Sequence, residues 1–86
     1  MNERPLYPKQ IFYSEHAAER MVERGFSSED VRRILFTGDV AVSSYQPPKG
    51  PRRHARQLVL RGHPAKVVFV IWPTRYDIIT VEWVTE

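Results

Sequence analysis

Three residues near the start of the chain have side chains suited to a phosphodiester and recur at every fourth position: His16, Arg20 and Arg24. An imidazole can accept or donate a proton near neutral pH. A guanidinium matches the oxygens of a phosphate and can stabilise the charge on a pentacoordinate phosphorus. The stripe therefore suits binding or cleavage of a phosphodiester. The alternative is a helix face in contact with water, on which Arg20 pairs with Glu23 at i, i+3 spacing.

A second group of candidate residues lies in the segment KGPRRHAR, residues 49–56. It combines one histidine with four cationic side chains: Lys49, Arg52, Arg53, His54 and Arg56. On an alternating strand, His54 and Arg56 share a face with Leu58 and Leu60. Because the two leucines favour the core, we expect His54 and Arg56 at the rim of the core side. The alternative is a solvated hairpin tip, although a basic tip can still follow a phosphate backbone.

Four aromatic residues on or beside the expected strands could stack on unpaired bases: Tyr45, Trp72, Tyr76 and Trp83. Packing in the core or across strands is the more frequent use of such residues, and it is the expectation for Trp83. Tyr76 follows Arg75 in an expected turn. It is therefore the best candidate for an exposed aromatic that contacts RNA.

The charges are distributed unevenly along the chain, whose net charge is +3. No Asp or Glu lies between Asp39 and Asp77, and that interval contains seven Lys or Arg residues. Such one-sided charge favours a polyanionic partner, either nucleic acid or an acidic protein segment. Four of these cations are expected to bind the phosphates that flank the reacting one: Lys49, Arg52, Arg53 and Arg61. A basic surface that only maintains solubility is the alternative.

Several classes of chemistry are disfavoured. The chain has no cysteine, and its three histidines do not follow a metal-ligand spacing. Only Asp77 and Glu82 supply carboxylates in the second half of the expected sheet, which disfavours a two-metal nuclease. We therefore expect no metal or other cofactor. Any cleavage of RNA should then use the 2′-hydroxyl as the nucleophile.

The totals fit one domain over residues 1–86, because 86 residues leave little room for a second core. The N-terminal MNERPLYPKQ has no apolar core, so it does not resemble a signal peptide. The longest apolar run, VVFVIW, is too short to span a bilayer. We expect a cytoplasmic protein with no membrane partner.

Two helices are expected to position the first stripe. Ser14 is a typical N-cap and Gly25 a typical residue after a helix end. The apolar side of this helix should consist of four residues: Ala17, Ala18, Met21 and Val22. A second helix is expected from Ser27 or Ser28 to Gly38, with Val31, Ile34 and Leu35 facing the core.

Four strands are expected after the helices, in the segments DVAVSSYQ, RHARQLVLRG, KVVFVIW and DIITVEWV. The third segment is apolar throughout, as in a central strand buried on both faces. The expected fold is α+β, with two helices on one face of a four-stranded, mainly antiparallel sheet in the order α-α-β-β-β-β. The basic, proline-rich segment 46–53 is the expected mobile loop.

The segment FYSEHAAERMVERGFSSEDV, the glycine-ended second helix and the closing IITVEW resemble the domain of unknown function family DUF4258. The resemblance covers about residues 11–84, and that family is placed with the barnase, EndoU, colicin and RelE-like ribonuclease fold. It implies an RNA-cleaving toxin of a toxin–antitoxin pair, with His16, Arg20 and Arg24 in the helix-borne motif. It also implies a cognate antitoxin whose acidic or amphipathic segment covers the basic face.

Our first hypothesis is a metal-independent endoribonuclease toxin that acts on RNA, including mRNA on the ribosome. His16 would be its general base or acid, while Arg20 and Arg56 would hold the scissile phosphate. Arg24 and Tyr76 would make further contacts to the RNA. A non-catalytic module that binds RNA or protein is the second hypothesis. The third is an accessory domain without specific affinity for RNA.

Overall fold

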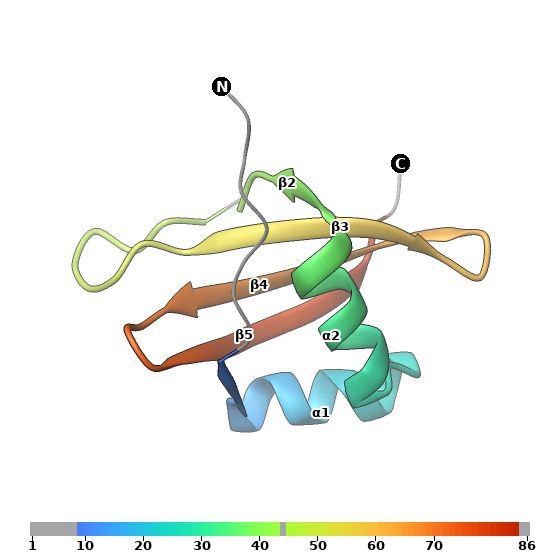
Figure 1. Cartoon of the computed structure of the whole chain (residues 1–86), viewed down its shortest axis with the longest axis horizontal. Helices are drawn as coiled ribbons and strands as arrows, with labels where there is room; N and C mark the ends of the chain where they lie inside the picture. The colour runs from blue at the N-terminus through green and yellow to red at the C-terminus, as the bar shows by residue number, and fades with distance from the viewer. Residues whose placement is uncertain (1–8, 44, 85–86) are drawn as a thin grey trace.

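A five-stranded mixed sheet and two helices make up the structure, a computed structural model that describes residues 9–43 and 45–84 (Figure 1). The elements follow one another as β1 (Gln10–Tyr13), α1 (Glu15–Arg24), α2 (Ser28–Thr37), β2 (Asp39–Ala41), β3 (His54–Leu60), β4 (His63–Ile71) and β5 (Arg75–Trp83). The strand order is β1-β5-β4-β3-β2. β1 runs parallel to β5, and the other neighbours are antiparallel.

Both helices begin and end where the sequence predicts. The Ser14 hydroxyl accepts a 2.9 Å hydrogen bond from the Ala17 amide, and Gly25 ends α1 with a φ of 75° that favours glycine. Ser27 starts α2 through a capping box with Asp30. These local signals explain why the helix boundaries can be predicted without knowledge of the sheet.

The apolar side of α1 is narrower than expected. Ala17 is fully buried and Met21 is half-buried, whereas Ala18 is exposed and Val22 is 84% exposed. The helix lies along β5 and contacts β1 weakly, so only a thin stripe of its surface meets the sheet (Figure 1). The prediction was therefore wrong for Ala18 and Val22.

The sheet differs from the prediction at both edges. The prediction of four strands was wrong because it missed β1, which pairs in parallel with β5 from Gln10↔Arg75 to Tyr13↔Ile78. The segment QIFY is only four residues long, and its partner lies more than sixty residues away. At the opposite edge, β2 ends at Ala41 instead of continuing through the expected DVAVSSYQ.

β4 is the central strand that its apolar sequence predicts. Val67 and Phe69 face the helices, and Val68 and Val70 face the other side, yet all four are at most 5% exposed. On the helix side they join one core with Val31, Ile34 and Leu35 of α2, as expected. Within the described part of the chain, neither helix combines the length and apolar character that crossing a membrane requires.

Candidate functional site

The His16 stripe and Arg56 lie on elements that are not neighbours in the fold. His16 is exposed, and no hydrogen bond or ion pair joins it to any residue that the structure describes. Arg20 pairs with Glu23 at 2.5 Å, as the water-exposed interpretation of the stripe predicts. α1 packs along β5, whereas Arg56 belongs to β3, which is separated from β5 by β4.

Arg24 binds the sheet itself. Its Nη1 donates a 2.6 Å hydrogen bond to the carbonyl oxygen of Val81, and the indole of Trp83 donates one of 2.8 Å to the Arg24 carbonyl. β1 pairs with the first residues of β5, and among the residues described no strand lies beside the rest of that edge. The Ser14 hydroxyl donates in the same way to Ile79, at 3.2 Å. α1 thus satisfies backbone groups of an open edge.

Arg56 lies where the alternation of β3 predicts. The register places His54 opposite Phe69, Arg56 opposite Val67 and Leu58 opposite Ala65, all on the face that carries the helices. Arg56 is half-buried, and its Nη1 donates a 3.0 Å hydrogen bond to the Gly38 carbonyl. The guanidinium therefore connects the end of α2 to β3.

Tyr76 is a buried residue of β5, so the expectation of an exposed tyrosine in a turn was wrong. Only 1% of it is exposed. Its ring packs edge-on against Phe36 at 5.8 Å and Phe69 at 6.1 Å, and the Lys9 Nζ lies 5.1 Å from its centroid. β5 begins at Arg75, which makes Tyr76 its first inward-facing position. A ring packed on this many sides has no face for a stacked base.

Tyr13 and Tyr76 each lie near an arginine. Burial raises the pKa of the Tyr13 hydroxyl above its ordinary value, and the charge of Arg32 partly opposes this. Burial likewise raises the pKa of Tyr76, against the charge of Arg56. Both phenols are therefore protonated at neutral pH and can donate a proton or a hydrogen bond.

His54 completes a group that we call the core-side cluster: Tyr13, Arg32, His54, Arg56 and Tyr76. Phe69 connects its members, since it stacks on His54 at 5.8 Å and contacts Tyr76. Phe36 connects Tyr76 to Arg32: it packs against the Tyr76 ring, and the guanidinium carbon of Arg32 lies 5.5 Å from the Phe36 centroid. The cluster thus brings one imidazole, two phenols and two guanidinium groups to one face of the sheet.

Cations surround one end of the sheet, which we call the basic end. Antiparallel pairing puts the starts of β3 and β5 beside the end of β4, and parallel pairing adds the start of β1 (Figure 1). The basic residues there are Lys9, Lys49, Arg52, Arg53, Arg56 and Arg75. The Gln46 side chain donates to the Arg53 carbonyl at 2.7 Å and accepts from its amide at 2.9 Å, which closes the basic loop beside the sheet.

Comparison with protein families matches residues 13–83 to the family described as Domain of unknown function (DUF4258). The chain belongs to the DUF4258 family. This confirms the predicted family over nearly the expected residues 11–84, whereas the relation to RelE-like ribonucleases stays a prediction. No curated protein and no solved structure matches the chain.

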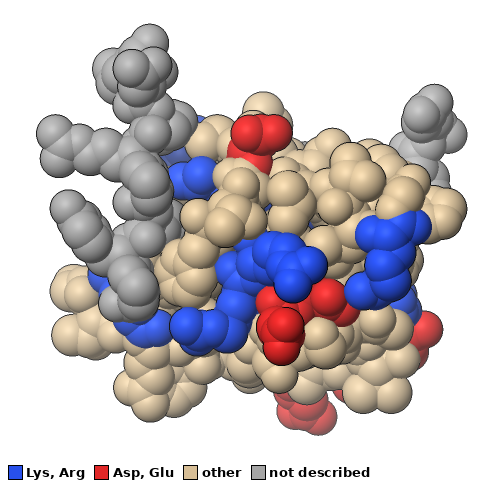
Figure 2. Space-filling model, turned by 45° about the vertical axis from the view of Figure 1, so that its right-hand side comes forward, with Lys and Arg blue, Asp and Glu red and all other residues tan. Residues whose placement is uncertain are grey.

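The opposite end of this DUF4258 domain holds Arg61, which the sequence assigns to a flanking phosphate. Arg61 forms a 3.2 Å ion pair with Asp30 and lies 5.7 Å from the ring centroid of Trp83. Trp83 also stacks on Phe26 at 4.5 Å, which confirms its expected packing role. Lys66 pairs with Glu82 at 3.7 Å. Charges that are far apart in the sequence therefore meet in the fold, and Figure 2 shows acidic side chains directly against basic ones.

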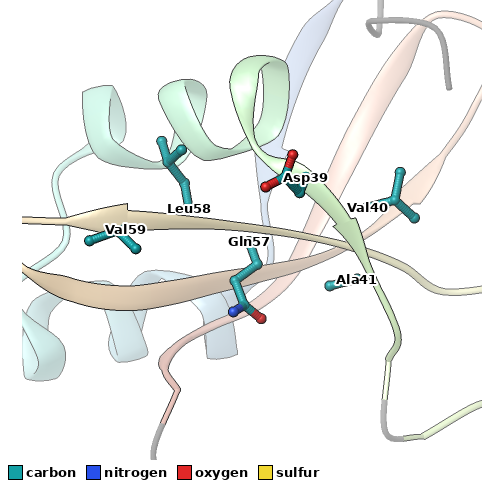
Figure 3. A pocket seen from close by; sticks show the side chains of 6 residues that line it. All are labelled: Asp39, Val40, Ala41, Gln57, Leu58 and Val59. Atoms are coloured by element: carbon teal, nitrogen blue, oxygen red, sulfur yellow. The ribbon is translucent and has the colours of Figure 1, made fainter. Parts of the chain in front are cut away.

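A groove of about 480 Å³ lies along the β2 edge of the DUF4258 domain (Figure 3). Its lining consists of Asp39, Val40, Ala41, Gln57, Leu58 and Val59. Asp39 is the only titratable group among them, so the groove offers no acid–base pair. No three His, Asp or Glu side chains gather closely enough to hold a metal ion in the part of the domain that the structure describes. The expected absence of a cofactor stays a prediction.

Sequence reasoning identified part of the core-side cluster. The alternation from His54 to Leu60 placed His54 and Arg56 correctly. Tyr13 and Arg32 were missed because they belong to a strand that was not expected and to the polar side of α2. The signal available for Tyr13 was its position directly before the Ser14 cap, which is where a strand entering a helix ends.

Proposed function

We propose that this protein is a metal-independent endoribonuclease whose site is the core-side cluster at the basic end. It would be the toxin of a toxin–antitoxin pair, as the resemblance to the RelE-like ribonuclease fold implies. The observation that supports the proposal best is the placement of His54 and Arg56 on one strand face. This supplies a proton acceptor and a charge stabiliser near the cations of the basic loop.

The reaction needs only these groups and the RNA. His54 takes the proton of a 2′-hydroxyl, and the 2′-oxygen attacks the adjacent phosphorus. The Arg56 guanidinium stabilises the charge on the pentacoordinate phosphorus. The bond to the 5′-oxygen then breaks, and Tyr13 or the protonated His54 returns a proton to that oxygen. The products are a 2′,3′-cyclic phosphate and a 5′-hydroxyl.

The proposal transfers the role of general base from His16 to His54. His54 shares a strand face with Arg56, whereas His16 lies on α1 along the β5 edge. Arg20 is paired with Glu23 and Arg24 with the Val81 carbonyl. Two of the three members of the original stripe therefore already have partners within the fold.

Three histidines in three places allow a matched test of the general base. The assay is cleavage of a long RNA of mixed sequence in EDTA, with His54→Ala, His16→Ala and His63→Ala compared with wild type. His63 is exposed at the other end of the sheet. The His54 variant should lose a factor of about 10² to 10⁴ in rate, while the other two retain wild-type cleavage. Loss in His16→Ala alone would return the site to α1.

A non-catalytic RNA-binding module is the second candidate function. It is favoured by the burial of Tyr76 and by the hydrogen bond from Arg56 to Gly38, because both contacts also serve packing. It predicts salt-sensitive RNA binding without product, even with translating ribosomes present.

The proposed antitoxin would cover the basic end with an acidic segment. Lys49 and Arg52 are exposed there and are available for such a contact. Because the antitoxin and RNA would use the same cations, a poly-glutamate peptide should compete with RNA for the protein. RNA binding that persists at saturating peptide would place the two partners on different surfaces.

A further inference from the structure

We infer that the basic end binds single-stranded RNA by stacking bases on three exposed aromatic side chains: Phe12, Tyr45 and Trp72. The inference rests on the proposed RNA function and adds the form of RNA that is recognised. It is independent of whether the core-side cluster cleaves the strand.

The described aromatic residues that are exposed to solvent all lie at one end of the sheet. The exposed ones are Phe12 at 42%, Tyr45 at 55% and Trp72 at 37%. The other aromatic residues of the described ranges are buried or half-buried: Tyr13, Phe26, Phe36, Phe69, Tyr76 and Trp83. All three exposed rings lie at the basic end: β1 starts there, β4 ends there, and Tyr45 lies beside Arg53, directly before the start of β3.

Phe12 and Trp72 are fixed in one patch by Arg75 and Asp77. The Trp72 indole donates a 2.7 Å hydrogen bond to Asp77, whose carboxylate also pairs with the Arg75 Nε at 3.0 Å. The Arg75 guanidinium carbon lies 5.0 Å from the Phe12 centroid. Lys9 donates a 3.0 Å hydrogen bond to the Trp72 carbonyl. The indole is thus oriented in advance, at low entropic cost for a ligand that stacks on it.

Tyr45, directly before the basic loop, also combines an exposed aromatic ring with a neighbouring arginine. The Arg53 guanidinium carbon lies 5.2 Å from its ring centroid. The Gln46 amide bonds twice to the backbone of Arg53, which holds this part of the loop in place. Each of Phe12 and Tyr45 therefore has a guanidinium within about the range of a cation–π contact.

This combination matches the chemistry of an unpaired strand. Exposed aromatic rings stack on bases, and neighbouring cations bind the phosphates between them. In a duplex the base faces are already stacked on one another, so the rings have nothing to bind. Cations alone can bind a phosphate backbone, and exposed aromatic rings add nothing to such binding. Three exposed rings at the same end therefore indicate contacts with bases.

The test uses a single-stranded RNA of about twelve nucleotides, which suits a surface of this size. Every ribose carries a 2′-O-methyl group, so that cleavage cannot occur. Its affinity is measured by fluorescence anisotropy and compared with that of the same sequence as a duplex. The variants are Trp72→Leu and Tyr45→Leu, with Trp72→Phe as the conservative control and Val59→Ala as an exposed apolar control away from the patch. Circular dichroism melting verifies that each variant is folded.

The single strand should bind more tightly than the duplex. Each Leu variant should lose about tenfold in affinity for the single strand. Trp72→Phe keeps a ring but loses the hydrogen bond to Asp77, so its loss should be smaller than that of Trp72→Leu, and Val59→Ala should bind like wild type. Equal affinity of Trp72→Leu and wild type would overturn the inference, as would tighter binding of the duplex. Trp72-dependent binding of poly-glutamate without any binding of RNA would also overturn it and assign the patch to an acidic protein.

The two proposals fail separately in these assays. Trp72-dependent binding of the blocked strand, with no cleavage of unmodified RNA, would leave the inference intact and refute the ribonuclease. Cleavage of unmodified RNA together with binding that does not depend on Trp72 or Tyr45 would refute the inference alone.

Discussion

The guanidinium of Arg24 donates a 2.6 Å hydrogen bond to the backbone carbonyl of Val81, 57 residues later in the chain. The carbonyl lies on the part of β5 that β1 does not reach. An arginine that the spacing on α1 presents as a phosphate ligand is therefore a support for the sheet edge. The site that we propose for RNA lies at the other end of β5.

Replacing Arg24 should affect stability. Arg24→Ala removes a charged donor from a partly buried carbonyl and should lower the free energy of unfolding by about 1–2 kcal/mol. Urea denaturation measures the effect. Arg33→Ala is the matched control, since Arg33 makes only a loose 3.8 Å pair with Glu29 on the surface of α2. Equal stability of the two variants would show that the Val81 bond contributes nothing.

Asp30 should make stability depend on pH in acid. The hydrogen bond from the Ser27 amide, followed by the Arg61 contacts, lowers the pKa of Asp30 below its ordinary 3.8. A depressed folded-state pKa stabilises the protein above the unfolded value, and this stabilisation is lost as the pH falls through the folded value. The advantage of wild type over Asp30→Asn should therefore be full at neutral pH and shrink below about pH 4.

The measurement is chemical denaturation of both proteins across that range. Glu19→Gln, which alters an exposed carboxylate of α1, is the control for the loss of one negative charge. A difference between wild type and Asp30→Asn that stays constant down to strongly acidic pH would contradict the assignment.

Tyr76 should make the protein less stable as the pH rises, whereas Asp30 makes it less stable as the pH falls. Burial raises the pKa of its hydroxyl above 10.0, so the folded state favours the neutral phenol. The resulting stabilisation is present below the unfolded pKa and is lost as the pH rises through the folded value. Tyr76→Phe should therefore lose less stability than wild type between neutral pH and pH values above 10. Parallel curves for the two proteins would mean that the hydroxyl is not desolvated.

Gly38 is required for space at the junction of α2 and β3. A Cβ atom at this position would lie 2.5 Å from the Ile34 carbonyl oxygen and 2.9 Å from that of Gln57. Both are backbone atoms, so Gly38→Ala should destabilise the domain by about 1–3 kcal/mol. Gly25→Asn provides the contrast, because nothing lies near that Cβ and asparagine tolerates a φ of 75°. Thermal melts in which the two variants unfold together would contradict this reading.

The helices were predictable because their signals are local. Ser14, Gly25 and Ser27 act within three or four residues of their own positions, so a sequence pattern contains the whole interaction. The apolar run of β4 is equally direct, because burial on both faces leaves no room for a polar residue.

The features that the sequence did not predict depend on contacts between segments far apart in the chain. β1 forms because it can pair with the free edge of β5. The four residues of β1 do not themselves indicate that this edge is present. Tyr76 is buried because β5 begins at Arg75, two residues before the expected strand DIITVEWV. Arg61 finds Asp30, 31 positions away, which cancels part of a charge asymmetry that looks absolute along the chain. The position of Arg56 was predictable, since alternation with Leu58 fixes it, but its partners were not.

The parallel pairing of β1 with β5 also sets an order of events during synthesis. Residues 10–13 are synthesised before the other strands and pair in the fold with residues 75–78 of β5, the last strand of the described chain. The hydrogen bonds from Arg24 and Ser14 to β5 also cannot form before this strand has been made. A nascent chain that lacks β5 therefore has neither its first strand in place nor the support for its first helix, and long-range pairing of this kind is slow to form. The fold should reach its final form only when nearly all of it has left the ribosome, so a half-made chain cannot display the basic end in its folded geometry.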